Sequence, residues 1–188
     1  IWSSKLTMTD RFFKRLMDLM IAFLLLVLTS PILILTALFI RLSSRGPIIF
    51  SQARAGLSGN NFYIYKFRSM NVTEPGDKKN LQSAKFNDPR FYPFGRFIRK
   101  YSIDELPQIF NVIKGDMSIV GPRPHAINHN EIYKELIPEY MQRHIFKPGI
   151  TGLAQVSGFR GEIKSKNMME KRVEMDLDYM NNWSLKLD

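Results

Sequence analysis

The sequence predicts an α+β protein that is mainly helical and is attached to a membrane. Three observations predict this fold class: an uncharged apolar run, a pair of short strands around a turn, and several amphipathic helices. We expect a single domain over residues 1–188. It would contain a re-entrant membrane helix over 19–40, a small β-hairpin, and amphipathic helices at the membrane interface.

The composition narrows the classes of partner. The 188 residues carry a net charge of +10, and 45% of them are hydrophobic, so the chain can bury a core. This basic balance favours an anionic partner, which can be nucleic acid, anionic lipid or a phosphorylated substrate. The absence of cysteine excludes disulfides, zinc–thiolate sites and thiol nucleophiles.

The apolar run Leu19–Ile40 is long enough to span a bilayer, which takes about 20 residues. Ser30 and Pro31 lie at its midpoint, and proline inside a helix costs about 3 kcal/mol because it removes a backbone donor. The freed carbonyl of Val27 then needs a partner, and we expect the Ser30 hydroxyl to bond the carbonyl of Leu26 and stabilise a bend. Each half reaches about 16 Å, roughly half of the hydrocarbon core, so a broken helix can enter and return.

The charges that flank the apolar run also bear on its topology. Lys14 and Arg15 precede the run, and Arg41 and Arg45 follow it. A spanning helix usually has its basic residues biased to one side, whereas basic residues at both ends suit two ends on the cytoplasmic face. The pattern therefore favours the re-entrant helix, and a proline-kinked spanning helix stays open as the alternative.

The rest of the chain shows strand, loop and helix patterns in turn. Ile48 to Met70 is typical of a hairpin, because a Gly/Asn-rich turn separates two β-rich runs. A polar loop is expected over Asn71–Arg90, and a loop with a short strand over 147–162. Helices are expected at about Phe94–Lys100, Ser102–Lys114, Glu131–Phe146 (interrupted at Pro138) and 167–183.

The stretch KYSIDELPQIF contains two adjacent carboxylates, Asp104 and Glu105. Ser102 and Glu105 fit the capping-box spacing, which is the purely structural interpretation. That interpretation leaves Asp104 unexplained. Beside Arg99 and at the positive end of a helix, an ionised aspartate can attack phosphorus, and the pair can bind a divalent metal.

Several basic residues are candidate phosphate contacts. The GPRP stretch holds Arg123 between two prolines, and a stiff backbone suits bidentate phosphate binding, although a plain turn is an equal alternative. Lys66 and Arg68 are two apart on a strand, where a solvated face is the alternative. Lys147 and Arg160 lie on glycine-rich loops that can approach a ligand closely. The sequence has no Walker loop, G-x-G-x-x-G, zinc-finger spacing or RNP-type strand.

The ordered motifs resemble a known family over nearly the whole chain. They are KRLMD and LTSPILI, GPIIFSQARAGLSGNNFYIYKFRSM, GRFIRKYSIDELPQIFNVIKGDMSIVGPRPHA, RHIFKPGITGLAQVSGFRGE and EKRVEMDLDYMNNWSL. This set is similar to the bacterial sugar transferase family, the monotopic polyprenyl-phosphate phosphoglycosyl transferases. Within the family it is most like the catalytic domain of undecaprenyl-phosphate glucose phosphotransferases.

The resemblance implies a two-step reaction with Mg²⁺. A hexose-1-phosphate would pass from a UDP-sugar to polyprenyl phosphate with release of UMP, as the first membrane step of exopolysaccharide, capsule or O-antigen synthesis. Asp104 would be the nucleophile that holds the phosphosugar, and Glu105 would assist in metal binding or proton handling. The implied substrate-binding residues are Arg99, Arg123, Lys66, Arg68, Lys147 and Arg160.

The resemblance also implies a cellular setting. It places Ser30 and Pro31 at the break of a re-entrant helix, with Lys14, Arg15 and Asp18 at its base. The expected location is the cytoplasmic face of the bacterial inner membrane, on anionic lipid, without nucleic acid and with a possible homodimer. Glucose is the expected sugar and galactose the next. Two further alternatives are a non-catalytic basic membrane adaptor and a metal-dependent phosphatase or nuclease. Large members of the family carry an N-terminal membrane bundle and a soluble domain, so we expect this chain to be one part of a longer protein.

Overall fold

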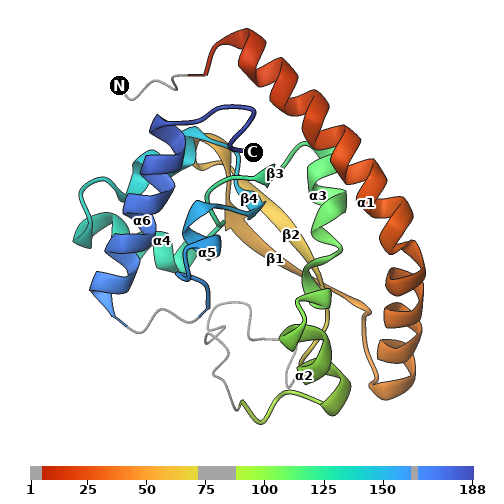
Figure 1. Ribbon diagram of the computed structural model, residues 1–188. Helices are drawn as coiled ribbons and strands as arrows, with labels where there is room; N and C mark the ends of the chain where they lie inside the picture. Colours follow the sequence, from red (N-terminus) through yellow and green to blue (C-terminus); the bar gives the residue numbers. More distant parts are fainter. Residues whose placement is uncertain (1–5, 72–87, 162–164) are drawn as a thin grey trace.

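A long helix forms one side of the molecule, and a β-hairpin and shorter helices pack beside it (Figure 1). The computed structural model describes residues 6–71, 88–161 and 165–188. The helices are α1 (Met8–Ser43), α2 (Pro93–Lys100), α3 (Gln108–Lys114), α4 (Ile127–Leu136), α5 (Leu153–Val156) and α6 (Lys166–Asn181). The strands are β1 (Ile49–Ala55), β2 (Asn61–Phe67), β3 (Ser118–Val120) and β4 (Gly149–Thr151), with 3₁₀ turns at Leu57–Gly59, Ile103–Glu105 and Tyr140–Ile145.

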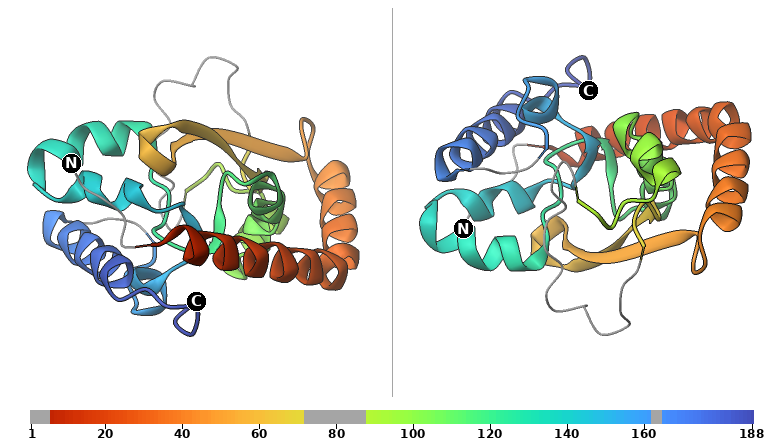
Figure 2. Two further views of the ribbon diagram at one scale, coloured as in Figure 1. Left: turned by 90° about the horizontal axis from the view of Figure 1, so that it is seen from above. Right: turned by 90° about the horizontal axis from the view of Figure 1, so that it is seen from below.

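Helix α1 continues through Pro31, so the predicted break at this point is not confirmed. The Ser30 hydroxyl donates to the carbonyl of Val27 at 2.8 Å, which makes Leu26, the predicted acceptor, wrong. Val27 carries the carbonyl that proline cannot bond, and Ser30 therefore satisfies it directly. The helix is not straight: Figure 2 shows its two parts pointing in different directions.

The middle of α1 is exposed, whereas one face of the helix is buried on either side of it. Lys14, Asp18 and Ala22 are buried near its beginning, and Thr36 and Ile40 near its end. By length and composition α1 could cross a membrane, with a mean hydropathy of 2.7 in its most apolar window. The exposed apolar side chains between the two ends include Phe23, Leu24, Val27, Leu28, Ile32, Ile34 and Leu35.

Polar contacts fix the first part of α1. The Asp18 carboxylate accepts hydrogen bonds from the Ser118 hydroxyl at 2.8 Å and from the backbone N–H of Ile119 at 2.9 Å. Arg15 donates to the carbonyls of Val112 at 2.6 Å and Ile113 at 3.0 Å, at the end of α3. A cation on the last carbonyls of a helix satisfies groups that have no partner within that helix.

The last part of α1 is held by a different set of residues. Ile40 packs against Phe67 of β2. The guanidinium of Arg68, just after β2, donates to the carbonyls of Ser44 and Arg45, where the chain leaves α1. Both ends of the long helix are therefore bound to the same folded unit.

The predicted hairpin is confirmed. Strands β1 and β2 are antiparallel, with Ile49 opposite Phe67 and Ala55 opposite Asn61. Its buried residues join α1 and α3 in one core cluster, formed by Ala22, Phe62, Ile64, Ile109, Val112 and Met117.

A second sheet, which was not predicted, pairs β3 with β4 in parallel. A Cβ atom built on Gly149 would lie 2.1 Å from the backbone nitrogen of Gly121, so this approach requires glycine. These two glycines of the GPRP and KPGITG stretches therefore serve a contact between two segments of backbone.

The other predicted helices are confirmed with shifted bounds. α2 and α6 lie where the sequence placed them, and the third expected helix divides at Pro138 into α4 and a 3₁₀ turn. The helix expected from Ser102 begins later, as α3 at Gln108, after a separate 3₁₀ turn. Most of the loop predicted over Asn71–Arg90 lies outside the described residues. In Figure 1, α4, α5 and α6 lie on the side of the hairpin opposite α1.

Candidate functional site

The two adjacent carboxylates lie on the 3₁₀ turn Ile103–Glu105, between α2 and α3. Ser102 has a φ of 60° in the left-handed region and makes no capping bond to the turn that follows. Its hydroxyl instead accepts a hydrogen bond from Arg160. The capping-box interpretation is therefore wrong, because both of its side chains are used in tertiary contacts. Holding a non-glycine residue in the left-handed region costs about 1–3 kcal/mol of conformational free energy, and such residues cluster at functional sites.

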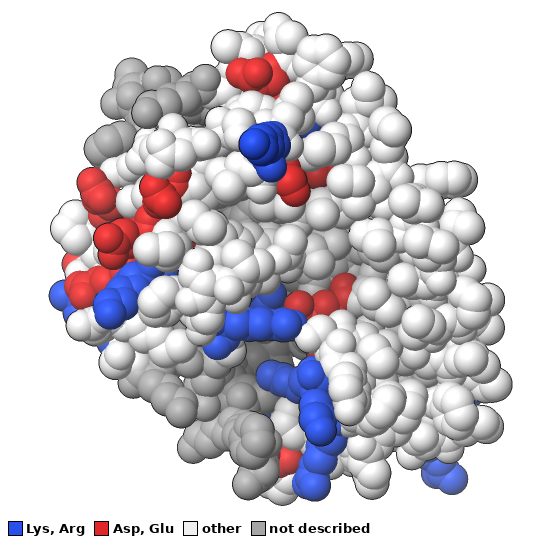
Figure 3. All heavy atoms as spheres, in the orientation of Figure 1, with Lys and Arg blue, Asp and Glu red and all other residues white. Residues whose placement is uncertain are grey.

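Basic side chains from three separate segments lie within 4.0 Å of the Glu105 carboxylate. Its carboxylate lies 2.7 Å from the Lys66 ammonium on β2 and 2.6 Å from the Arg123 guanidinium of the GPRP turn. Arg160, after α5, lies 3.7 Å away. Figure 3 shows basic and acidic side chains around a hollow in this face of the molecule, in the region where α2 and α3 meet. One carboxylate thus organises three basic groups that are far apart in the sequence.

Asp104 differs from its neighbour. It is only 6% exposed, yet its carboxylate has no hydrogen bond or ion pair with the described residues. Burial raises the pKa of Asp104, opposed by the positive charge of Lys66 and reinforced by the Glu105 carboxylate. Burial also acts on Glu105, but Arg123 and Lys66 outweigh it and hold the pKa of Glu105 well below its usual range. The pair therefore consists of a Glu105 carboxylate held by ion pairs and an Asp104 carboxylate without a partner among the described residues.

The remaining predicted residues divide into two groups. Arg99 stacks on the ring of Phe91 at 4.9 Å and acts electrostatically on Asp104, so it belongs to the site. Arg68 and Lys147 are not brought to the carboxylates. Arg68 is bound to backbone carbonyls at the end of α1, and the charges near Lys147 are Arg15, Asp18 and Asp116.

One residue of this region was missed by the sequence reasoning. Arg54 on β1 is half-buried, and loss of solvent, together with the nearby charge of Arg123, lowers its pKa to about 10. Glu105 acts on it in the opposite direction. The signal that could have found Arg54 is the strand alternation of the predicted hairpin. Once the register of the two strands is known, this alternation places Arg54 on the same face of the hairpin as Lys66.

A network of buried polar side chains contacts the backbone of the GPRP turn. Arg143 donates to the backbone carbonyl of Arg123 at 2.8 Å and forms an ion pair with Asp176 of α6 at 2.5 Å. The His125 ring contacts the Tyr140 hydroxyl at 2.7 Å and also the Arg143 guanidinium. The side chains of Arg143 and Asp176 are each only 2% exposed. The network therefore fixes the backbone that carries Arg123.

The donor set at the carboxylates is suitable for magnesium rather than for zinc. No cluster of three His, Cys, Asp or Glu side chains occurs in the described part of the chain. Mg²⁺ is commonly bound through one or two carboxylates together with the phosphates of the substrate. Asp104 and Glu105 supply carboxylates next to cations that suit a phosphate, so the residues present fit this ion.

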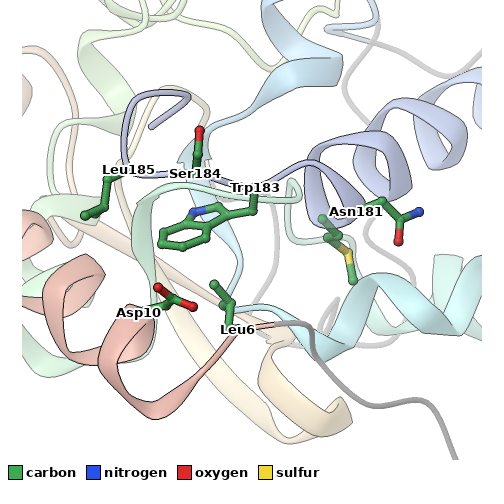
Figure 4. A pocket seen from close by; sticks show the side chains of 7 residues that line it. Leu6, Asp10, Asn181, Trp183, Ser184 and Leu185 are labelled. Carbon is green, nitrogen blue, oxygen red and sulfur yellow. The ribbon is translucent and has the colours of Figure 1, made fainter.

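A cavity of about 280 Å³ lies elsewhere, between the beginning of α1 and the C-terminal segment. Figure 4 shows the Trp183 ring in it, with Leu6 and Asp10 from the other side. The Asp10 carboxylate is already bonded to Thr7 at the N-cap of α1, and the described residues that line the cavity include no lysine or arginine. This cavity therefore lacks the basic side chains that surround Asp104 and Glu105.

Comparison with known proteins shows the family of the chain. A family model described as bacterial sugar transferase matches residues 9–188. The chain belongs to the bacterial sugar transferase family. This bacterial sugar transferase is 50% identical over 188 residues to a UDP-glucose:undecaprenyl-phosphate glucose-1-phosphate transferase of Klebsiella pneumoniae. The aligned part covers all of this chain and 40% of the relative.

Two further relatives show the range within this family. A protein of Xanthomonas campestris pv. campestris with the same description is 52% identical over 175 residues, covering 93% of this chain and 36% of the relative. A UDP-N-acetylgalactosamine-undecaprenyl-phosphate N-acetylgalactosaminephosphotransferase of Aeromonas hydrophila is 43% identical over 178 residues, covering 94% of this chain and 41% of the relative. This bacterial sugar transferase thus spans well under half the length of these relatives.

Proposed function

We propose that the chain is the catalytic part of a phosphoglycosyl transferase that moves glucose-1-phosphate from UDP-glucose to undecaprenyl phosphate and releases UMP. The observation that carries this proposal is the buried, unpaired carboxylate of Asp104 beside basic side chains held on Glu105. The names of the relatives support the donor, the acceptor and the glucosyl group. In the cell this reaction would begin the synthesis of an exopolysaccharide, capsule or O-antigen.

The mechanism follows from the different settings of the two carboxylates. A carboxylate oxygen of Asp104 attacks the sugar-linked phosphorus, the phosphorus–oxygen bond to UMP breaks, and UMP leaves with that electron pair. In the second step a phosphate oxygen of the lipid attacks the same phosphorus and displaces Asp104. Lys66, Arg99 and Arg123 stabilise the negative charge that develops on the phosphoryl oxygens.

Glu105 contributes by position rather than by attack. Its ion pairs hold Lys66 and Arg123 in place before substrate arrives, and groups fixed in this way need no reorganisation during reaction. Mg²⁺, held by Asp104 and Glu105 together with the diphosphate, would neutralise charge on the leaving UMP.

The proposed topology is a helix that enters the membrane from the cytoplasmic face and returns to it. Asp18 is bonded to Ser118 and Ile119, and Ser44 is bonded to Arg68, so both ends of α1 are fixed to one folded unit. A spanning helix would place one end across about 30 Å of hydrocarbon from the other. The bend in α1 and the exposed apolar middle support the re-entrant arrangement, with the basic flanks on anionic lipid of the inner membrane.

Cysteine labelling tests this topology in a chain that has no cysteine of its own. In cells with the single replacements Met8→Cys and Arg45→Cys, we expect both positions to react only with a reagent that has access to the cytoplasm. Position 8 is 83% exposed in the fold, so a lack of reaction reports on the membrane rather than on burial. Labelling of the two positions from opposite sides would show that the helix spans the bilayer.

Activity is tested directly by release of UMP from a panel of UDP-sugars. With undecaprenyl phosphate and Mg²⁺ present, we expect UDP-glucose to give the fastest release, and we expect omission of either the lipid or Mg²⁺ to stop multiple turnovers. The panel includes UDP-N-acetylgalactosamine because one relative is described as an N-acetylgalactosaminephosphotransferase. It also includes UDP-galactose, the second sugar expected from the sequence. Release of hexose-1-phosphate to water without formation of a lipid product would instead indicate a phosphatase.

A further inference from the structure

Arg54 lies on the face of the hairpin that carries the active-site lysine. In the register of β1 and β2, Phe50 is opposite Lys66, and Arg54 is four residues further along the same strand. Side chains an even number apart on a strand point to the same face, so Arg54 and Lys66 share one face. Arg54 also forms an isolated antiparallel bridge with Ala126, two residues after the GPRP turn. Its backbone therefore lies beside the segment that carries Arg123.

The charge of Arg54 is poorly compensated by the protein. Among the described side chains, the guanidinium of Arg54 donates a hydrogen bond to the neutral amide oxygen of Gln52 at 2.5 Å. Its Nε atom is buried without a partner. No carboxylate lies within 4.0 Å of it in the described part of the chain. Burial and the neighbouring Arg123 lower its pKa to about 10, so it is still a cation at neutral pH.

Three other arginines have a buried Nε atom without a partner, and their guanidinium groups have different neighbours. Arg143 has the Asp176 carboxylate, and Arg68 and Arg172 donate to backbone carbonyls. A buried cation without an anion is unfavourable, and burial of charge is normally accompanied by pairing. Among the described residues, Arg54 is therefore like Arg172 in that its hydrogen-bond partner is a neutral oxygen and no carboxylate lies within 4.0 Å of it.

The surroundings of Arg54 have a surplus of positive charge. Among the described residues, five basic side chains lie around two carboxylates, Asp104 and Glu105, which leaves a surplus of three positive charges; the basic residues are Arg54, Lys66, Arg99, Arg123 and Arg160. Arg54 and Arg123 repel one another as long as no anion lies between them. A phosphoryl oxygen between two guanidinium groups would remove that repulsion and accept charge-assisted hydrogen bonds.

We propose that Arg54 is a substrate-binding residue that contacts the diphosphate of the nucleotide donor together with Arg123. This inference rests on the proposed function, since it names a further contact for the same donor. It also has a consequence for stability. Removing a half-buried charge that has no carboxylate within 4.0 Å among the described residues should leave the stability of the ligand-free protein unchanged or increase it, although ligand binding becomes weaker.

The test compares Arg54→Gln and Arg54→Lys with the wild-type chain in lipid nanodiscs, using UDP as the ligand. Calorimetric titration gives the Kd for UDP, and thermal unfolding without ligand gives Tm. We expect Arg54→Gln to raise the Kd about tenfold or more, which is the effect of one lost hydrogen bond to a charged group. Arg54→Lys keeps the charge but not the planar fork, so its Kd should lie between the two. The matched control is Lys134→Gln, which removes one exposed charge on α4 and should leave the Kd unchanged.

The outcomes separate a contact with substrate from a structural role. A raised Kd in Arg54→Gln with an unchanged or higher ligand-free Tm supports the inference. A Kd within twofold of wild type overturns it, and so does a lowered Tm with a normal Kd. If Arg54→Gln does not fold, a wild-type Kd in Arg54→Lys overturns it as well. Failure of the wild-type chain to release UMP would contradict the proposed function itself, which is a different result.

Discussion

Asp104→Asn is expected to lower UMP release by about 10³-fold or more, because a carboxamide cannot replace the attacking carboxylate. The fold should tolerate the change. Asp104 has no hydrogen bond or ion pair with the described residues, so the substitution breaks no structural contact. We therefore expect the Tm of the variant to match the wild-type value, with steady-state UMP release as the measurement of activity.

The matched control for this variant is Asp178→Asn, which removes one exposed carboxylate on α6. We expect it to retain wild-type activity. Mass spectrometry of the wild-type chain with UDP-glucose and without lipid acceptor should show the added mass of a hexose-phosphoryl group on the peptide that contains Asp104. Near-normal turnover by Asp104→Asn would exclude Asp104 as the nucleophile.

Asp176→Leu is expected to have the largest effect on stability. It leaves the guanidinium of Arg143 buried without an anion, and breaking a buried ion pair in this way costs about 3–5 kcal/mol of unfolding free energy. UMP release should also decrease, because Arg143 is bonded to the backbone carbonyl of Arg123. Denaturant unfolding and the UMP assay measure the two effects on the same preparation.

Two controls separate burial from charge in this prediction. The double variant Arg143→Met and Asp176→Leu removes both charges and should recover much of the lost stability, since apolar replacements of buried pairs are often neutral or favourable. Glu131→Gln breaks the exposed pair with Lys134 and should cost less than about 1 kcal/mol. A small loss in Asp176→Leu, similar to that of Glu131→Gln, would show that the buried pair does not support the turn.

Local patterns in the sequence predicted most of the larger elements. The hairpin and α2 follow from apolar periodicity and turn residues, and the division of the third helix follows from Pro138. The parallel sheet could not be predicted in the same way. Its strands have three residues each, too few to show a period, and their pairing depends on two glycines that are distant in the sequence.

The site shows the same difference between local and distant effects. The carboxylates, Arg123 and Lys66 could be chosen from the sequence because their residue types suit phosphate chemistry. Ser102 was given a capping alternative because the local spacing fits, but ion pairs formed in the folded protein take the Glu105 side chain away. Arg68 was expected beside Lys66, but β2 ends at Phe67 and the side chain instead closes the turn after α1.

In the proposed topology, the double attachment of α1 has a consequence for how the protein would meet its lipid acceptor. When both ends of a helix are fastened to one folded unit, the depth to which its middle enters a bilayer is set by the protein and not by the thickness of the membrane. Asp104 would then lie at a constant height above the acyl chains. A phosphate carried on a long isoprenoid tail would arrive at that level simply by diffusing sideways in the leaflet, without any large movement of the protein.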